Sequence, residues 1–444
     1  MALRSLPSSL RRHWKPTSNP TQRNAPASTA SYHDYIRFAT PGTHSFLHNC
    51  NEISTRISTL NSFLLLIQSG GTGRIPLHSP KVIGVSTSRG NRSSQEDFHS
   101  YAALSLNPEE LRLSLKKAHQ IDWDPTNFPP PLARQVLFVG IYDGHGGSTV
   151  SQFLRQELHG RFESADKSHV PELGGALAPW VSPDVDTAKQ EMDLEARSTL
   201  AFFEVDKTLY LDAAAQECGA TASVVLLQTL DNPSTPFFAS DKVSLTVVHV
   251  GYVVSPGSIQ LTIPDLETHF PSCGLLYRYI RDTRVLLTST DGAKVIPMTE
   301  NHHAEARVES VRLRRMMGSG LITDSFGEAR WMGALANTRS LGDMKYKPFG
   351  VTPEPEVRTK LLTDGISSVV SDDEISDLAR GAKTPREAAD RILAFAEEMG
   401  SEDNCTALVV PLAGWGKISG QDRTRELREY RKKQMVGSER QRRM

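Results

Sequence analysis

Hydrophobic residues along this chain follow two spacings, one typical of buried strands and one typical of amphipathic helices. Short, nearly continuous apolar runs, as expected for buried strands, lie at residues 81–87, 136–141, 220–227, 243–250 and 407–412. Apolar residues recur with helical spacing at residues 148–162, 188–211 and 385–399. Helices beside several strand-like runs indicate a layered α+β domain rather than a regular alternation of strands and helices.

The two ends of the chain differ from its middle. No acidic residue precedes Asp34, while arginine, serine and threonine are frequent there, a composition typical of a mitochondrial transit segment. A basic tail with no targeting role is the alternative. We therefore expect a transit segment and linker over residues 1–78, a folded domain over 79–412 and a basic C-terminal tail over 413–444.

Composition excludes several classes of protein. A formal net charge of −1 over 444 residues gives no reason to expect nucleic acid or a membrane surface as partner. Cysteines 50, 218, 273 and 405 form no C-x-x-C pair, which argues against a disulfide framework or a zinc site. The longest apolar run near the start, residues 63–67, is too short to span a bilayer, so no integral membrane segment is expected.

The candidate chemistry begins where the run at 136–141 ends. Asp143, Gly144 and His145 follow this run, and Gly146 and Gly147 come next. A carboxylate at a strand end beside glycines suits a hard cation, because the glycines let the backbone approach closely. His145 adds a group that can carry a proton near neutral pH. A plain glycine-rich turn is the alternative interpretation.

Further carboxylates lie near other strand-like runs. The adjacent Glu96 and Asp97 repel each other unless water or a cation offsets their charges, and an exposed acidic pair is the alternative. Arg92 could hold a phosphate as a charged fork, or it could be an ordinary surface arginine. With Asp364 and Asp403, these acids offer oxygen ligands and no competing His or Cys cluster, a set that suits Mg²⁺ or Mn²⁺. Two such ions can activate water for phosphoryl hydrolysis.

The order of these motifs resembles the metal-dependent type 2C Ser/Thr protein phosphatases. The matching residues are Arg92, Glu96-Asp97, Asp143-Gly144-His145-Gly146-Gly147, Gly219-Ala220-Thr221-Ala222, Arg339-Ser340-Leu341-Gly342-Asp343, Thr363-Asp364-Gly365 and Asp403-Asn404. The resemblance covers roughly residues 80–412. It implies an α+β fold with a central antiparallel β-sandwich flanked by helices, in four α-β-β-α layers, and a two-metal site at one end of the sandwich.

The resemblance also implies roles for individual residues. The implied metal ligands and their supports are Glu96, Asp97, Asp143, Gly144, Asp364 and Asp403. Asp143 would bridge two ions, Arg92 would bind the substrate phosphate, and His145 would protonate the departing serine or threonine oxygen. The stretches at 219–222 and 339–343 match family motifs that we interpret as chiefly structural.

Two departures from the family pattern concern metal ligands. Residues 252–281 separate Gly251 from Asp282, and we expect them to be an inserted segment that the fold tolerates, since the cost of loop closure grows slowly with length. Asp282 matches the aspartate linked to a third, more weakly held ion. Only residues 358–362 lie between Val357 and Thr363, which leaves too few residues for the usual turn and buried strand. This shortening predicts that Asp364 is poorly held.

The sequence therefore predicts a monomeric Mg²⁺- or Mn²⁺-dependent protein Ser/Thr phosphatase of the mitochondrial matrix, which acts on phosphoproteins. A catalytically weak member of the family that binds phosphoproteins is the alternative from another class. A small-molecule phosphoesterase also stays open, because its chemistry would be the same.

Overall fold

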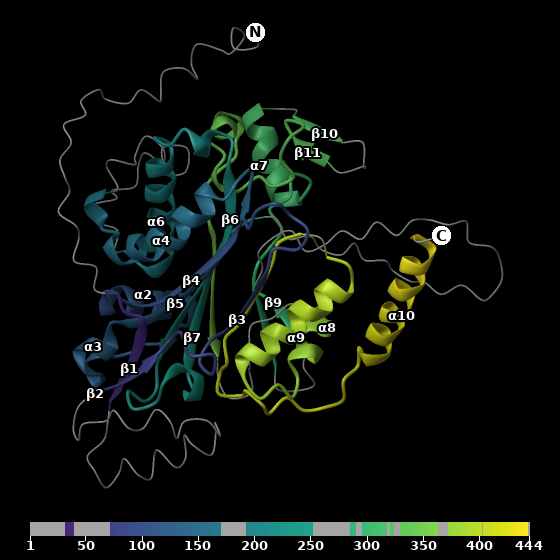
Figure 1. Cartoon of the computed structure of the whole chain (residues 1–444). Coiled ribbons are helices and arrows are strands. Elements are labelled where there is room, and N and C mark those ends of the chain that lie inside the picture. Colours follow the sequence, from purple (N-terminus) through teal and green to yellow (C-terminus); the bar gives the residue numbers. More distant parts are fainter. Residues whose placement is uncertain are drawn as a thin grey trace, which may run out of the picture.

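A computed structural model describes the chain at residues 32–39, 72–169, 192–251, 285–289, 295–317, 320–323, 329–362, 372–401 and 403–442 (Figure 1). Within these ranges a large antiparallel sheet packs on a second β-layer, and helices cover the outer face of each. The predicted α+β sandwich with four layers is thus confirmed. Asp282, Asp364 and the expected insertion at 252–281 lie outside the described residues.

The larger sheet supplies the strands that lead to the site. Its members are β4 (Asp97–Ser105), β5 (Gln135–His145), β6 (Gly219–Thr229), β7 (Val243–Val250), β12 (Leu341–Gly342) and β13 (Glu356–Leu362). Five of its six strands follow the order β13-β7-β6-β5-β4. The sixth, β12, pairs with β6 outside this order. Phe138 and Val224 face the helices, whereas Leu137 and Val225 face the second β-layer, because successive side chains of a strand point to opposite sides.

Helices α4 (Thr149–Ser164) and α6 (Leu194–Leu209) cover one face of this sheet. Phe162 of α4 packs edge-on against Phe138 of β5 and against Phe202 of α6, with ring centroids 5.3 and 6.0 Å apart. Helix α2 (Pro108–His119) is joined to α6 by a buried ion pair between Glu110 and Arg197. The shorter η3 (Pro125–Asn127) and α3 (Pro130–Ala133) connect α2 to β5.

The second β-layer and its helices complete the sandwich. Strands β3 (Gly84–Ser88) and β14 (Cys405–Val409) pair antiparallel, and α8 (Asp372–Ala379) and α9 (Pro385–Glu398) pack on them through a separate apolar cluster. Strands β8 (Leu286–Thr288) and β9 (Val295–Pro297) pair with each other, and Leu287 joins the core between the layers. The runs at 81–87 and 407–412 thus contribute to β3 and β14, and the helical pattern at 385–399 forms α9.

A hairpin-like pair near the N-terminus was not predicted. Strands β1 (Tyr35–Ala39) and β2 (Thr72–Pro76) pair antiparallel, and Ile36 and Ile75 are buried in the core between the layers. The Gln135 side chain accepts a hydrogen bond from Arg37 N (2.7 Å) and donates one to Arg37 O (2.9 Å), which ties β1 to the start of β5. The interpretation of residues 32–78 as linker is therefore wrong for these two strands.

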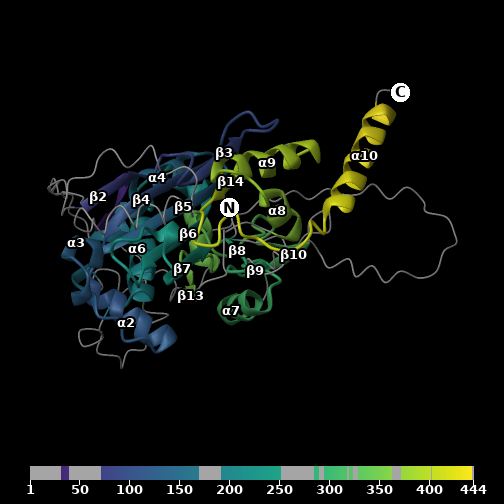
Figure 2. The same cartoon turned by 90° about the horizontal axis from the view of Figure 1, so that it is seen from below.

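The remaining elements lie at the margins of the sandwich. Helix α7 (Arg307–Met317) and the paired β10 (Leu321–Thr323) and β11 (Ala329–Trp331) lie together at the top of Figure 1. Helix α10 (Arg425–Arg442), part of the basic tail, projects away from the body (Figure 2). In the described ranges we find no helix with the length and apolar character needed to cross a membrane.

Candidate active site

Two neighbouring strands bring the first acidic pair together at one end of the larger sheet. Asp97 begins β4, Asp143 lies near the end of β5, and the register pairs them directly. By strand alternation both share the face of Val139, which is directed toward the second β-layer. From that layer, Thr406 of β14 donates a hydrogen bond to Asp97 Oδ2 (3.1 Å). This acidic pair therefore lies between the two layers, at one end of the larger sheet.

Asn404 holds the loops that carry the remaining acidic residues. Its Oδ1 accepts a hydrogen bond from Glu96 N (2.6 Å), while its Nδ2 donates to the carbonyls of Arg89 (2.8 Å) and Ser94 (3.1 Å). Asp403 precedes Asn404, so the same residue positions acids that are distant in the sequence. Asn404 belongs to the Asp403-Asn404 motif, and the sequence predicted no separate role for it.

Gly144 leaves room for the loop before β4. Its N–H donates to Glu96 O (3.1 Å), and Ser151 Oγ of α4 donates to the same carbonyl (2.6 Å). A Cβ at position 144 would lie 2.5 Å from Ser151 Oγ and 2.7 Å from Glu96 O. A side chain there would collide with backbone, so this position requires glycine.

The electrostatics of the acidic group favour a cation. Burial, with the charges of Asp403 and Glu96, raises the pKa of Asp97 to about 6, although hydrogen bonding with Thr406 and Asp143 opposes the rise. A carboxylate that is partly protonated near neutral pH lacks compensating positive charge, and the oxygen donors around it suit Mg²⁺ or Mn²⁺.

The described carboxylates do not form a complete metal site. In the part of the chain that the structure describes, no three His, Cys, Asp or Glu side chains are grouped closely enough to hold an ion. Asp282 and Asp364, the further predicted ligands, lie outside the described residues. The described residues therefore suit a metal centre in the type of their side chains and in their location between the layers. Asp97, Asp143 and Asp403 are the described acids closest to that location.

Arg92 lies beside Asp403 at the surface. Its Nε and Nη2 atoms lie 2.8 Å from the two carboxylate oxygens of Asp403, and 44% of its side chain is exposed. This two-pronged geometry is the one in which arginine also binds phosphate. The structure thus places Arg92 next to the acidic group, with a carboxylate as its partner.

His145 ends β5 and contacts a residue that the sequence analysis had taken as structural. Its Nε2 lies 2.8 Å from Oδ2 of Asp343. Burial alone would lower the pKa of His145, but the charge and hydrogen bond of Asp343, with the charge of Glu96, outweigh burial and raise it above the ordinary value. His145 and Asp343 are 198 positions apart, and no spacing rule connects them.

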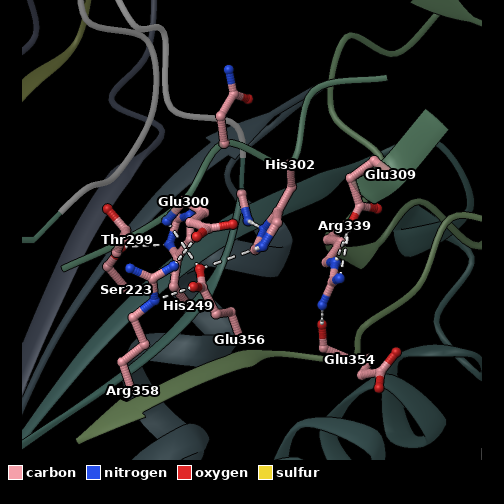
Figure 3. Close-up of polar contacts among 12 residues, drawn as sticks. Ser223, His249, Thr299, Glu300, His302, Glu309, Arg339, Glu354, Glu356 and Arg358 are labelled. Carbon is pink, nitrogen blue, oxygen red and sulfur yellow. Dashed lines mark hydrogen bonds and ion pairs between the residues drawn. The ribbon is translucent and has the colours of Figure 1, made fainter. Parts of the chain in front are cut away.

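Arg339 has the structural role that its motif suggested. Its Nε and Nη2 donate to Oε1 of Glu309 (2.9 and 2.7 Å), and its Nη1 donates to the carbonyl of Glu354 (3.1 Å; Figure 3). Arg312 donates to the other carboxylate oxygen of Glu309, which is 1% exposed. These buried ion pairs anchor α7 beside the sandwich.

Two buried histidines next to this network are also structural. The rings of His249 and His302 stack with centroids 5.0 Å apart (Figure 3). Nδ1 of His249 shares a hydrogen bond with Ser223 Oγ (2.9 Å), and Nδ1 of His302 accepts one from Gly251 N (3.2 Å). Burial lowers the pKa of His249 to about 3 and also lowers that of His302, so both rings are neutral at physiological pH.

Strand β13 extends without a break to Leu362, the residue immediately before Thr363. It pairs with β7 from Glu356 opposite His249 to Leu362 opposite Val243, and therefore runs away from the end of the sheet that holds Asp143. No residues remain for a separate turn and strand before Thr363, in agreement with the sequence analysis. Asp364 itself lies beyond the described part of the strand.

Comparisons with known proteins point to one family. A family model described as "Protein phosphatase 2C" matches residues 282–405. The chain is 30% identical over 380 residues to "Protein phosphatase 2C homolog 4" of Schizosaccharomyces pombe, covering 79% of this chain and 85% of that protein. It is 29% identical over 304 residues to "Protein phosphatase 1K, mitochondrial" of Xenopus laevis, covering 64% of this chain and 63% of that protein.

Solved structures with a related arrangement are more distant. A serine-threonine phosphatase 2C from Toxoplasma gondii aligns with a TM-score of 0.43 and 16% identity, covering 74% of this chain and 94% of that one. A C. elegans sex determining protein aligns with a TM-score of 0.46 and 16% identity, covering 85% of this chain and 74% of that one.

Proposed function

Because this chain belongs to the protein phosphatase 2C family, we propose that it is a Mg²⁺- or Mn²⁺-dependent phosphatase for phosphoserine and phosphothreonine in proteins. The observation that carries the proposal is the acidic group at the end of β4 and β5. There Asp97 and Asp143 are paired, Asp403 and Glu96 lie close enough to influence the pKa of Asp97, and that pKa is raised to about 6. A bound cation would offset this charge.

The residues proposed to hold the ions are Glu96, Asp97, Asp143, Gly144 and Asp403, with Asp364 and Asp282 from outside the described residues. When bound, the ions supply an activated water and neutralise charge on the phosphoryl oxygens. The fixed contacts of Asn404 with Glu96 and with the 89–94 loop hold these ligands in place before any ion binds.

Two other side chains act on the substrate in this proposal. Arg92 binds the phosphate, since its half-exposed guanidinium already holds a carboxylate in a two-pronged geometry that a phosphate can adopt. His145 gives a proton to the departing serine or threonine oxygen, and the charge of Asp343, which raises its pKa, favours the protonated form that this role needs.

We further propose that the protein acts as a monomer in mitochondria. The segment before Asp34 is rich in arginine and free of acidic residues. The similarity to a relative whose name includes "mitochondrial" supports the same location.

Mn²⁺-dependent phosphate release by the full-length chain tests the activity. We expect hydrolysis of a phosphothreonine peptide that requires Mn²⁺ and is lost on addition of a chelator or in Asp143→Ala. A folded protein that binds phosphopeptides without hydrolysing them would contradict the proposal and indicate a binding role. Hydrolysis confined to a small aryl phosphate would instead indicate a small-molecule phosphoesterase.

A further inference from the structure

In the contact between His145 and Asp343, the carboxylate is buried much more deeply than the imidazole. Asp343 is 1% exposed, whereas 35% of the His145 side chain is exposed. A carboxylate buried this deeply is costly unless a positive or hydrogen-bonding partner faces it. Its Oδ2 meets His145 Nε2 at 2.8 Å and accepts a hydrogen bond from Ser340 Oγ at 2.7 Å. Oδ1 has no hydrogen-bond partner within the described ranges.

The backbone around Asp343 is shaped to present this carboxylate. Asp343 has φ 53° and ψ 39°, a left-handed conformation that is uncommon for residues other than glycine. Its N–H donates to Cys218 O (2.9 Å), and the preceding strand β12 pairs Leu341 with Ala220. Strand β12 is therefore attached to β6, the neighbour of β5, and the turn after it directs Asp343 to the end of β5.

Gly219 provides the space in which the two side chains meet. A Cβ at this position would lie 2.2 Å from Asp343 Oδ2 and 2.5 Å from His145 Nε2. Both atoms of the hydrogen bond would collide with it. Gly219, which begins the Gly219-Ala220-Thr221-Ala222 stretch, is thus required for this contact. It has this role in addition to its place in strand β6.

We propose that Asp343 is a positioning residue for His145, an inference that rests on the proposed function. By accepting a hydrogen bond from Nε2–H it fixes the orientation of the imidazole and leaves Nδ1 to face the substrate. As water forms a new bond to phosphorus, the bond to the serine or threonine oxygen breaks. The departing oxygen keeps the electron pair and takes the Nδ1 proton. One proton of the water stays on the phosphate, and the other recharges the imidazole through solvent. Asp343 gives no proton and does not touch the substrate.

Comparing two leaving groups with Mn²⁺-loaded protein tests this role. A phosphothreonine peptide releases a poor leaving group that needs the proton, whereas 4-nitrophenyl phosphate releases a stable phenolate that does not. For Asp343→Asn we expect kcat on the peptide to fall about 10- to 100-fold, part of the roughly 100- to 10,000-fold that a positioned general acid contributes, with little change on the aryl ester. Gly219→Ala should show the same asymmetry, and it carries the test if Asp343→Asn does not fold.

Asp206→Asn is the matched control. Asp206 is also buried and supports the same turn, since its Oδ1 accepts a hydrogen bond from Gly342 N (3.0 Å) and pairs with Lys347 (3.0 Å). Among the described residues, Asp206 makes no hydrogen bond or ion pair with His145. We therefore expect Asp206→Asn to lower the rates on both substrates by the same factor.

Nitrogen NMR of the metal-free protein with ¹⁵N-labelled histidine gives a readout independent of activity. At a pH high enough for His145 to be neutral, we expect its single ring proton on Nε2 in the wild type and a mixture of the two tautomers in Asp343→Asn. Equal losses on both substrates in Asp343→Asn, with an unchanged tautomer, would overturn the inference and leave Asp343 with a purely structural role. A folded wild type that is inactive on the phosphopeptide would instead remove the proposed function, and the inference with it.

Discussion

Strands β5 and β13 belong to the same sheet, and each leads into a sequence that resembles a metal-binding motif. Strand β5 lies between β4 and β6 and ends beside the site, where Asp143 pairs with Asp97. Strand β13 is an edge strand, and it ends with Leu362 opposite Val243, at the other end of the sheet. The two motifs are similar in kind, but the strands that precede them run toward opposite ends.

The difference shows that a motif determines the type of ligand side chain, whereas the direction of the preceding strand determines where that side chain lies. From Glu356 to Leu362 an extended strand covers about 20 Å at the usual rise per residue. Two residues of extended chain span at most about 7 Å, much less than the length of β13. We therefore expect the site to depend more on β5 and its neighbours than on the motif after β13.

The largest effect should come from Asp143→Ala. Loss of a group that only supports a metal ligand already costs about 10- to 100-fold, so loss of Asp143 should reduce Mn²⁺ affinity and activity at least about 100-fold. Isothermal calorimetry and phosphate release measure the two effects. Asp122→Ala, at a side chain that is 68% exposed on the surface, is the control and should change neither. Unchanged Mn²⁺ affinity in Asp143→Ala would show that β5 does not carry a metal ligand.

Acid should weaken the part of the sheet where β13 begins. His249 pairs with Glu356 in the register, and burial lowers its pKa to about 3, below the ordinary 6.5. The unfolded chain therefore takes up a proton as pH falls below 6.5, while the folded protein does so only near pH 3. The free energy of unfolding should fall by about 1.4 kcal/mol for each pH unit in this window.

Urea unfolding between pH 7 and pH 5 measures this dependence, with His249→Gln as the control. The variant will be less stable at every pH, but its pH slope should be smaller than that of the wild type. Equal slopes would mean that His249 is not the group responsible.

The start of β5 should be sensitive to loss of Gln135. Gln135→Ala removes two hydrogen bonds to the backbone of Arg37, and at about 1 kcal/mol for each bond it should lower the free energy of unfolding by about 2 kcal/mol. Chemical denaturation measures the loss. Gln152→Ala is the comparison, because that side chain is exposed on α4 and should change stability by less than about 0.5 kcal/mol. Equal effects would show that β1 does not brace β5.

The smallest effect should come from Asp364→Ala. With β13 in its present register, we expect this substitution to lower Mn²⁺ affinity about 10-fold, the lower end of the effect of losing an outer partner of a metal and below the effect of Asp143→Ala. The same calorimetric titration decides the question. A loss as large as that of Asp143→Ala would show that β13 changes its pairing when metal binds.

Local pattern was sufficient for the elements that bury continuous apolar runs. The runs at 136–141 and 220–227 became β5 and β6, and the helical spacing at 385–399 became α9, because in each case the period of burial is visible in the sequence. Strands β1 and β2 escaped prediction, since each is short and residues 40–71 separate them.

The candidate site was predictable in its chemistry more than in its contacts. The acidic residues and His145 were identified from residue type and position after strands. The contact of Asp343 with His145 was not, since it depends on a left-handed backbone at Asp343, on the pairing of β12 with β6 and on the absence of a side chain at Gly219. Each of these is a property of the folded chain.

The pairing of β1 and β2 with the sandwich makes residues before the predicted domain boundary part of the folded core. His33 exchanges two backbone hydrogen bonds with Ala103 of β4, and Ile36 and Ile75 are each 2% exposed. Burial of one such side chain contributes about 1.5–3 kcal/mol. Loss of β1 would therefore expose apolar core residues, and a shortened protein that begins at residue 79 should aggregate. A shortened protein that keeps this fold has to retain the chain from His33 onward.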